Sequence, residues 1–375
     1  MGLLREELSA LYNAFVQGEP SPLPKLAIQY ADYAHWQKRT LKGEALKREL
    51  AFWRDMIGDA VPTLDLPADR PRPKATAYRS AIYRFDIDPE LVTALQRLRV
   101  NKGATLFMTL LSAFGVLLMR YTGQDELCVG TPVGGRSHQE FEGLIGFFVN
   151  TLVMRIDLSA KPTFRELLSR VREMTLQAYA HQAMPFEKLV EALFQQRNAP
   201  GRTPVGVLFS LQNTPQRPLK LSGMRCERIE AAKSSTRFDL TLSIKSSGRR
   251  LRGVFEYAAE IFDADRIERM ADHYRRLLQS IVAEPNYHIA GLSLLSEVER
   301  HQLLVQWNDT ACEYPSTDCA HELFETCVGR SPDATAVVAD NIQLSYVQLN
   351  CRANRLAHLL VSLGLERGAP VAMCL

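Results

Sequence analysis

An apolar run from Ala104 to Met119 constrains the fold of this chain more than any other feature. A helix needs about 20 apolar residues to cross a bilayer, so this run is too short to span one. Its apolar residues lie on all sides of a helix, which is typical of a helix buried in a protein core. The run therefore predicts a globular domain packed around a central helix, and a hydrophobic content of 46% is sufficient for such a core.

Charge and cysteine content exclude several classes of protein. Lys plus Arg number 45 and Asp plus Glu 42, and a net charge of +3 favours neither nucleic acid nor a membrane surface as a partner. The cysteines number seven, none are at CxxC spacing, and no Cys/His cluster fits a zinc pattern, so no metal site is predicted. An odd cysteine count without a signal peptide makes a reducing cytoplasm the expected location.

The N-terminal part of the chain reads as helices followed by a proline-rich connector. Helices are expected over Glu6–Phe15 and Ile28–Met56. The stretch Leu64–Pro73 contains three prolines in seven residues, which neither a helix nor a central strand accommodates. We interpret it as an extended connector between two lobes.

The middle of the chain alternates between strand and helix patterns. Strands are predicted over Tyr78–Ile87, Glu126–Val133, Phe147–Ile156, Val205–Leu211, Met224–Ile229, Phe238–Ile244 and Leu251–Tyr257. Helix starts are predicted at Asp88–Pro89, at a capping box of Thr163 with Glu166, and at Pro185. Apolar residues from Ile267 to Ile281 repeat at helical spacing. The pattern indicates the α/β class.

A polar joint follows and leads into a further unit. The joint ends near Tyr314–Pro315, and the next unit begins at His321 with a helix, a strand over Ala334–Ala339 and a helix over Ser345–Leu363. A strand expected from Pro370 has no room to finish, so we expect this unit to be incomplete.

The candidate chemical residues lie in two short segments. The sequence has no GxxxxGK[ST], GxSxG or HExxH signature. His181 is predicted to end one helix just before Pro185 opens the next, and a capping role is favoured over a catalytic one. Asn150 and Thr151 form a polar pair in an apolar strand. Asn150 either satisfies backbone groups or faces a substrate channel, and the sequence favours neither.

Together these segments resemble the condensation domains of nonribosomal peptide synthetases. Five motifs occur in the family's order over residues 2–285, and their succession is far more specific than any one alone. Tyr30–Gln37 is similar to YxDYAxWQ, Leu66–Pro73 to LPxDRPRP, Gly146–Thr151 to GFFVNT, His181–Leu193 to HQDxPFExLVEAL, and Phe209–Asn213 to an FSLQN-type strand.

The joint and the last unit extend the resemblance. Leu303–Thr310 is similar to the LLxxWNxT stretch that joins a condensation domain to an adenylation domain. The opening of an adenylation domain is resembled by His321–Glu325, Leu344–Asn350 and Ala353–Ala357. A freestanding acyltransferase of the same superfamily would not need this unit.

The resemblance implies a fold and a division of the chain. The family's fold is a pair of chloramphenicol-acetyltransferase-like lobes, each a mixed sheet flanked by helices, around a tunnel. We expect residues 1–73 to hold the tail of a first lobe and the connector, 74–285 the second lobe, 286–315 a linker, and 316–375 a truncated start of an adenylate-forming domain.

The resemblance also implies a reaction. Carrier proteins deliver phosphopantetheine-tethered donor and acceptor groups, the acceptor amine attacks the donor thioester, and an amide forms. Aligning two tethered reactants can remove several kcal/mol of barrier. Candidate tunnel residues are Phe147, Asn150, Thr151 and His181. The motif residues with an expected structural role are Tyr30, Asp32, Trp36, Pro185, Phe186 and Glu187.

The chain departs from the family where the chemistry is concentrated. The histidine that handles the amine proton belongs to an HHxxxDG motif, which these residues do not contain. Because Gly2–Leu8 resembles the helix after that motif, we expect the motif just upstream of Met1. A second departure is Ala183, where the family often has Asp. The motifs that bind ATP and Mg²⁺ would lie beyond Leu375, so no directly bound cofactor is expected.

No catalytic residue is therefore assigned within the chain. We expect the chain alone to catalyse neither condensation nor adenylation, with carrier proteins and the rest of a synthetase as its partners. The alternative from a different class is a non-catalytic module that docks carrier proteins.

Overall fold

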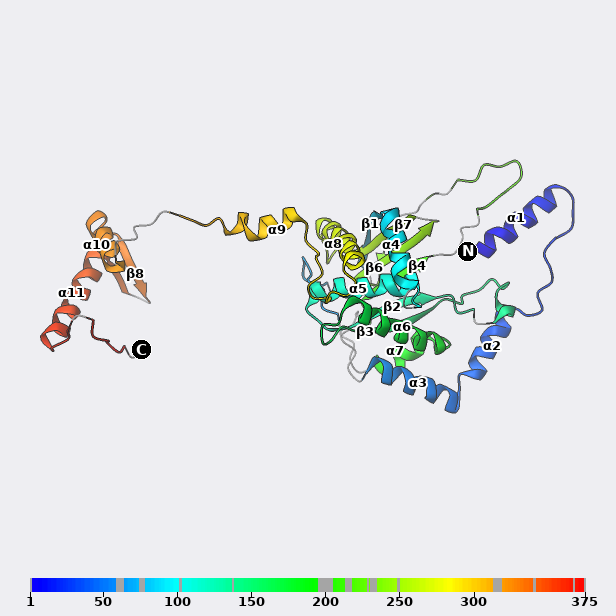
Figure 1. The fold of residues 1–375 in the computed structure, drawn as a ribbon, viewed down its shortest axis with the longest axis horizontal. Helices are drawn as coiled ribbons and strands as arrows, with labels where there is room; N and C mark the ends of the chain where they lie inside the picture. Colours follow the sequence, from blue (N-terminus) through cyan, green and yellow to red (C-terminus); the bar gives the residue numbers. More distant parts are fainter. Residues whose placement is uncertain are drawn as a thin grey trace. The chain divides into compact units, whose positions relative to one another are not determined.

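The computed structural model describes residues 2–58, 64–73, 78–100, 103–136, 138–194, 205–212, 218–227, 229, 235–247, 250–312, 319–339, 342–366 and 368–373. The chain divides into two compact units, residues 1–300 and 301–375, which are described separately (Figure 1).

The first unit is built on a sheet of seven strands in the order β3-β2-β4-β6-β7-β1-β5. The strands are β1 (Tyr78–Ile87), β2 (Glu126–Val133), β3 (Asn150–Asp157), β4 (Val207–Gln212), β5 (Ser235–Thr236), β6 (Leu240–Ser247) and β7 (Arg250–Ala258). The β2–β4 and β4–β6 pairs are parallel, and the other pairs are antiparallel. The expected mixed sheet of an α/β fold is confirmed.

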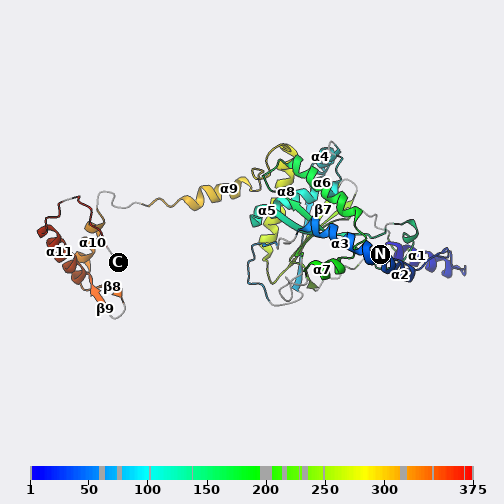
Figure 2. The ribbon, with the colours of Figure 1, turned by 90° about the horizontal axis from the view of Figure 1, so that it is seen from below.

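Four helices form a layer against this sheet (Figure 2). They are α4 (Pro89–Val100), α5 (Leu106–Thr122), α6 (Phe164–Ala180) and α8 (Ala264–Ala283). Every residue of α5 from Met108 to Met119 is buried, so the apolar run is the central core helix that the sequence predicts. The helix begins at Thr105, whose side chain accepts from the Met108 backbone nitrogen, and ends at Gly123 in the left-handed region.

The predicted amphipathic pattern of α8 fixes that helix in the layer. All seven apolar residues of the pattern, from Ile267 to Ile281, are buried. The hydroxyl of Tyr274 donates to the backbone oxygen of Leu110 at 2.9 Å, which joins α8 to α5. Rings of Phe114 from α5 and of Phe209 and Phe255 from the sheet pack in the same core.

The N-terminal segment differs from its prediction in one respect. The single helix expected over Ile28–Met56 is two helices, α2 (Tyr30–Thr40) and α3 (Gly43–Ile57). The break falls at Leu41–Lys42, and Gly43 has a φ of 56°, a backbone conformation that glycine adopts at little cost. Helix α3 packs on α7 (Phe186–Phe194) and on β3.

Helix α1 (Gly2–Val16) contacts a distant part of the chain. The Asn13 side chain donates to the Lys220 backbone oxygen at 3.2 Å and accepts from the Ser222 backbone nitrogen at 2.8 Å. The strand predicted over Met224–Ile229 is wrong for residues 224–227, which form no ladder. Met224 is 53% exposed, so the apolar residues that suggested a strand do not mark a core element here.

The proline-rich connector is extended, as expected, and is tied to the first unit along its length. Leu64 and Leu66 are buried in the main core. Asp69 forms an ion pair with Arg266 of α8, and its side chain accepts from the backbone nitrogen of Asp263 at 2.9 Å. These bonds start α8 and hold the connector beside it.

The second unit is small. It contains the short helix η2 (Gln306–Asn308), the helices α10 (Ala320–Arg330) and α11 (Tyr346–Ser362), and an antiparallel pair of strands, β8 (Thr335–Ala339) and β9 (Ile342–Ser345). Helix α9 (Glu297–Leu304) spans the boundary between the units. Ser345 and Gln348 form a capping box at the start of α11.

Candidate functional site

One face of the sheet is turned away from the helical layer and carries polar side chains. Phe209 and Phe255 point to the helices, where they pack with Phe114, so alternate residues of the same strands point the other way. In the middle of the neighbouring strands β4, β6 and β7, those residues are partly exposed and are Leu208, Ser210, Thr241, Ser243, Val254 and Glu256. We call these six residues the open-face strip.

Side chains of this strip form hydrogen bonds between neighbouring strands. Ser210 and Ser243 are paired in the β4–β6 ladder, and the Ser210 hydroxyl donates to the Ser243 hydroxyl at 2.9 Å. At the other side of the strip, the Ser80 hydroxyl donates to the Glu256 carboxylate at 3.0 Å. The strip can therefore present hydroxyl acceptors and donors to a bound amide or thioester.

Asn150 lies at the start of β3 and uses its side chain on backbone groups. Its amide nitrogen donates to the backbone oxygens of Gln182 and Met184 at 3.0 and 2.7 Å. Its amide oxygen accepts from the backbone nitrogens of Thr151 and Phe186 at 2.9 and 3.0 Å. The side chain thus fastens the turn between α6 and α7 to the edge of the sheet.

His181 ends α6 and faces α3 rather than the open-face strip. Its Nδ1 lies 3.0 Å from a carboxylate oxygen of Glu49, and its ring stacks on Phe52 with ring centroids 3.5 Å apart. The side chain is 31% exposed. Pro185 follows in the turn, Phe186 packs against the main core, and Glu187 lies in the first turn of α7. This arrangement packs α3, α6 and α7 together.

Phe147 belongs to a second group of motif residues, around a small aromatic core. Tyr33, Phe141, Leu144 and Phe148 form that core, with Tyr30 packed against it. Phe147 itself is 74% exposed, and its backbone oxygen accepts from the Tyr30 hydroxyl at 2.9 Å.

Arg136 contacts this aromatic core, and Asp32 caps the helix that carries Tyr30 and Tyr33. The guanidinium of Arg136 lies 4.3 Å from the centre of the Phe148 ring and donates to the backbone oxygen of Leu144 at 2.8 Å. Asp32 accepts from the Gln29 backbone nitrogen at 2.8 Å, which caps α2. Trp36 is 40% exposed and its ring contacts His138.

The structure therefore separates the predicted site residues into two places. Asn150, Thr151, His181, Pro185, Phe186 and Glu187 lie around the turn between α6 and α7, whereas Tyr30, Asp32, Trp36 and Phe147 lie around the small aromatic core. Sequence reasoning missed Ser210 and Ser243. Their signal is the alternation of polar and apolar residues within two predicted strands, which marks a face without indicating what it binds.

The described part of the chain offers neither a cluster of metal ligands nor a membrane span. No group of three or more His, Cys, Asp or Glu side chains there could hold a metal ion. No helix there is long and apolar enough to cross a membrane. Cys128 is buried, and that burial raises the pKa of its thiol to about 12, which argues against a role as a nucleophile.

A mixed sheet with one helical layer, five motifs around it and a polar open face define a domain of the condensation class. The condensation-domain family model matches residues 1–304, so the chain belongs to that family. The model of AMP-binding enzymes matches residues 324–375, which is the start of an adenylation domain.

Curated relatives are very long synthetases. The chain is 46% identical over 375 residues to one of the linear gramicidin synthase proteins of Brevibacillus parabrevis, covering 100% of this chain and 7% of that protein. It is 42% identical over 374 residues to malpinin synthetase of Mortierella alpina, covering 100% of this chain and 5% of that protein. The chain therefore spans less than a tenth of the length of these relatives.

Solved structures share the fold. The X-domain from teicoplanin biosynthesis has a TM-score of 0.72 at 27% identity, covering 79% of this chain and 68% of that one. A four-domain nonribosomal peptide synthetase, holo-AB3403 bound to AMP and glycine, has a TM-score of 0.74 at 22% identity, covering 98% of this chain and 28% of that chain. The condensation fold and its assignment to nonribosomal peptide synthetases are confirmed.

Proposed function

We propose that this chain supplies the second lobe of an amide-forming condensation domain, with the open-face strip as one wall of its substrate tunnel. The donor acyl thioester and the acceptor amine would be tethered to phosphopantetheine arms of carrier proteins. This proposal places the second lobe in residues 74–285, a linker in 286–315 and the start of an adenylation domain in 316–375.

The observation that carries the proposal is the chemistry of the strip. Condensation requires a surface that holds the donor thioester and the acceptor amine in the right orientation. The hydrogen-bonded hydroxyls of Ser210 and Ser243 offer such groups on the face of the sheet away from the helices. None of the strands β1 to β9 contains a histidine. A histidine that handles the proton of the attacking amine would therefore come from outside this sheet.

Four residues expected at the tunnel have different roles in this proposal. Phe147 has the exposed ring that a substrate could contact, and Thr151 follows Asn150 at the edge of the sheet. Asn150 and His181 act as positioning residues, because Asn150 bonds the turn between α6 and α7 and His181 bonds Glu49. Tyr30, Asp32, Trp36, Pro185, Phe186 and Glu187 support these elements.

We further propose that the 375 residues alone do not catalyse condensation, because they contain no HHxxxDG motif. A condensation assay with aminoacyl-loaded and peptidyl-loaded carrier proteins tests this directly. The chain alone should give the background rate, and the same chain joined to a first lobe that carries HHxxxDG should give turnover. Turnover by the chain alone would refute the proposal.

The role of the strip is tested in the joined protein. Ser243→Ala removes the acceptor of the Ser210 hydroxyl and should lower kcat/KM about tenfold or more without a comparable loss of stability. Ser169→Ala is a matched control, because Ser169 bonds the Arg165 backbone oxygen on α6, outside the strip. Equal effects of the two substitutions would contradict the proposed wall.

A second candidate function is a recognition module without catalysis. The observation that favours it is the likeness to an X-domain whose solved structure is a complex with OxyB. Binding of a carrier protein at micromolar affinity by the chain alone, with no turnover after a first lobe is added, would favour this candidate over condensation.

A further inference from the structure

The segment that follows α8 packs back onto the first unit. The backbone oxygens of Pro285 and Tyr287 accept from the backbone nitrogens of Arg165 and Phe164, each at 3.2 Å, at the start of α6. Farther along, the Arg120 guanidinium donates to the backbone oxygens of Ala290 and Leu292 at 2.9 and 3.0 Å. Three apolar side chains of the segment are buried in the main core, namely Ile289, Leu292 and Leu294.

Apolar packing stops before α9 begins. Leu295 is 39% exposed and Val298 is 79% exposed, and α9 buries none of its residues. A helix of this length, Glu297–Leu304, is marginal in water without tertiary contacts. Whatever holds its first turn on the first unit must therefore be polar.

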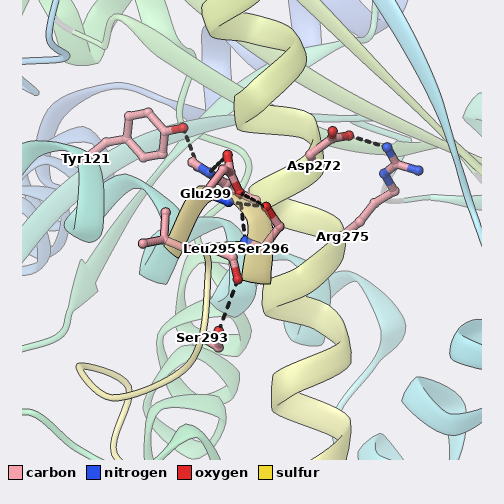
Figure 3. Close-up of polar contacts among 8 residues, drawn as sticks. Tyr121, Asp272, Arg275, Ser293, Leu295, Ser296 and Glu299 are labelled. Atoms are coloured by element: carbon pink, nitrogen blue, oxygen red, sulfur yellow. Dashed lines mark hydrogen bonds and ion pairs between the residues drawn. The ribbon is translucent and has the colours of Figure 1, made fainter. Parts of the chain in front are cut away.

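Figure 3 shows the polar contacts at that turn. Tyr121, Ser296 and Glu299 are labelled there. The Tyr121 hydroxyl, at the end of α5, lies 2.7 Å from Nδ1 of His273 on α8. Nε2 of His273 lies 3.1 Å from one carboxylate oxygen of Glu299 in α9. The other carboxylate oxygen of Glu299 accepts from the backbone nitrogen and the hydroxyl of Ser296, each at 2.7 Å. The Ser296 hydroxyl accepts from the Glu299 backbone nitrogen at 3.0 Å, which completes a capping box.

The two oxygens of Glu299 thus have separate tasks. One starts α9 through Ser296, and the other joins α9 to α8 through His273. Burial raises the pKa of Tyr121 to about 12, so its phenol keeps its proton and can donate to Nδ1. Nε2 of the imidazole then carries the hydrogen that is donated to the Glu299 carboxylate. The His273 side chain is 13% exposed, which limits competition from water.

We propose that Tyr121, His273 and Glu299 form a latch that holds the first turn of α9 on the rest of the first unit. The latch so fixes the point at which the chain leaves that unit. The latch goes beyond amide formation, because it acts on the connection to the unit that follows. An open latch would leave α9 attached only through the chain at Ser296.

The latch is tested by tryptic cleavage of the full 375-residue chain after Arg300, which lies inside α9. Cleavage there requires α9 to open, so its rate reports the population of the open form. His273→Ala removes the central group and leaves the capping box intact. We expect the peptide bond after Arg300 to be cut about tenfold faster, which corresponds to about 1.4 kcal/mol.

The matched control lies on the same helix. Asp272 forms an ion pair with Arg275 along α8 (Figure 3). Asp272→Asn removes that pair and leaves the latch, so cleavage after Arg300 should change less than about twofold, because neither partner of the pair belongs to the latch. The cleaved product is identified by mass spectrometry as the fragment beginning at His301.

An unchanged rate of cleavage after Arg300 in a folded His273→Ala chain would overturn the latch. If that variant does not fold, Tyr121→Phe decides the matter, because it removes only the hydroxyl that orients the imidazole. We expect it to speed cleavage about threefold, and no change in Tyr121→Phe would also overturn the proposal. Neither measurement needs a carrier protein or turnover, so failure of the latch and failure of the proposed condensation role are distinguishable.

Discussion

Arg72 of the connector forms an ion pair with Asp239, a residue that is 7% exposed and precedes β6. The Asp239 backbone nitrogen donates to the Gly206 backbone oxygen at 2.9 Å, and its backbone oxygen accepts from the Ala258 backbone nitrogen at 3.0 Å. Burial alone would lower the pKa of Arg72. The hydrogen bond to Asp239 and the negative charge of Asp239 raise this pKa by more than burial lowers it, so the guanidinium stays charged. One ion pair thus ties the connector to the point where β4, β6 and β7 meet.

Removing Arg72 alone should be costly. In Arg72→Ala, the Asp239 carboxylate stays buried without its cation, and breaking a buried pair in this way typically costs about 3–5 kcal/mol. Because the Arg72 side chain is 24% exposed, we expect about 3 kcal/mol, at the low end of the range. Urea denaturation of the chain measures the loss as a lower midpoint with an unchanged slope.

The matched control replaces both partners. Arg72→Met with Asp239→Leu removes both charges and keeps apolar volume, so this double variant should be clearly more stable than Arg72→Ala. A double variant that is less stable than the single one would show that the connector is held by something other than this pair.

Asn150→Ala should destabilise the first unit rather than merely alter a substrate contact. The substitution removes the donor to Gln182 and Met184 and the acceptor for Thr151 and Phe186, so four backbone groups lose a partner. We expect a loss of about 2 kcal/mol and a melting temperature about 3 °C lower. Asn308→Ala is a control, because that exposed amide also donates to two backbone oxygens. A similar loss in both variants would count against the role of Asn150.

The contribution of Glu299 to stability should depend on pH in one direction. Burial raises the pKa of its carboxyl, but hydrogen bonds from Ser296 and His273 outweigh this and place the pKa below its usual value. A depressed folded-state pKa gives stability that is present above the unfolded value, about 4.3, and is lost as the pH falls through the folded value.

Comparing the unfolding free energy of the wild type with that of Glu299→Gln measures this contribution. The difference should be constant near neutral pH and shrink as the pH is lowered from about 5 to about 3. Burial raises the pKa of Tyr121 to about 12, so its phenol stays protonated throughout this range. A difference that grows towards acid pH would contradict the assignment.

Much of the fold was predictable because its elements carry strong local signals. The uniformly apolar α5, the repeat of α8 and the capping box of Thr163 with Glu166 each specify one structure whatever surrounds them. The helix breaks at Gly43, whose positive φ does not continue a helix, and residues 224–227 are exposed and form no ladder, so apolar periodicity misled in both places. The pairing of Arg72 with Asp239 spans 167 positions, and no local pattern encodes it.

The candidate site was less predictable for the same reason. Asn150 drew attention as a polar residue in an apolar strand, yet its four partners are backbone groups, and three of them come near only through the turn between α6 and α7. Ser210 and Ser243 meet because β4 and β6 pair in parallel across a long crossover. A single sequence gives the alternation of each strand but not which strands become neighbours.

Gly253 should tolerate no side chain, although its backbone is in an ordinary strand conformation. It is paired with Phe85 in the β1–β7 ladder, and a Cβ atom would lie 2.2 Å from the Phe85 ring. That ring is itself packed against Phe255 and Tyr274, so it cannot move aside without disturbing the core. Gly253→Ala should therefore cost about 2–3 kcal/mol through overpacking.

Gly329→Ala provides the contrast, because Gly329 lies in α10 with nothing within 4 Å of an added Cβ. This substitution should stabilise the second unit by up to about 1 kcal/mol through helix propensity. Chemical denaturation of both variants measures the two opposite shifts, and a destabilising Gly329→Ala or a neutral Gly253→Ala would contradict the packing described for these two positions.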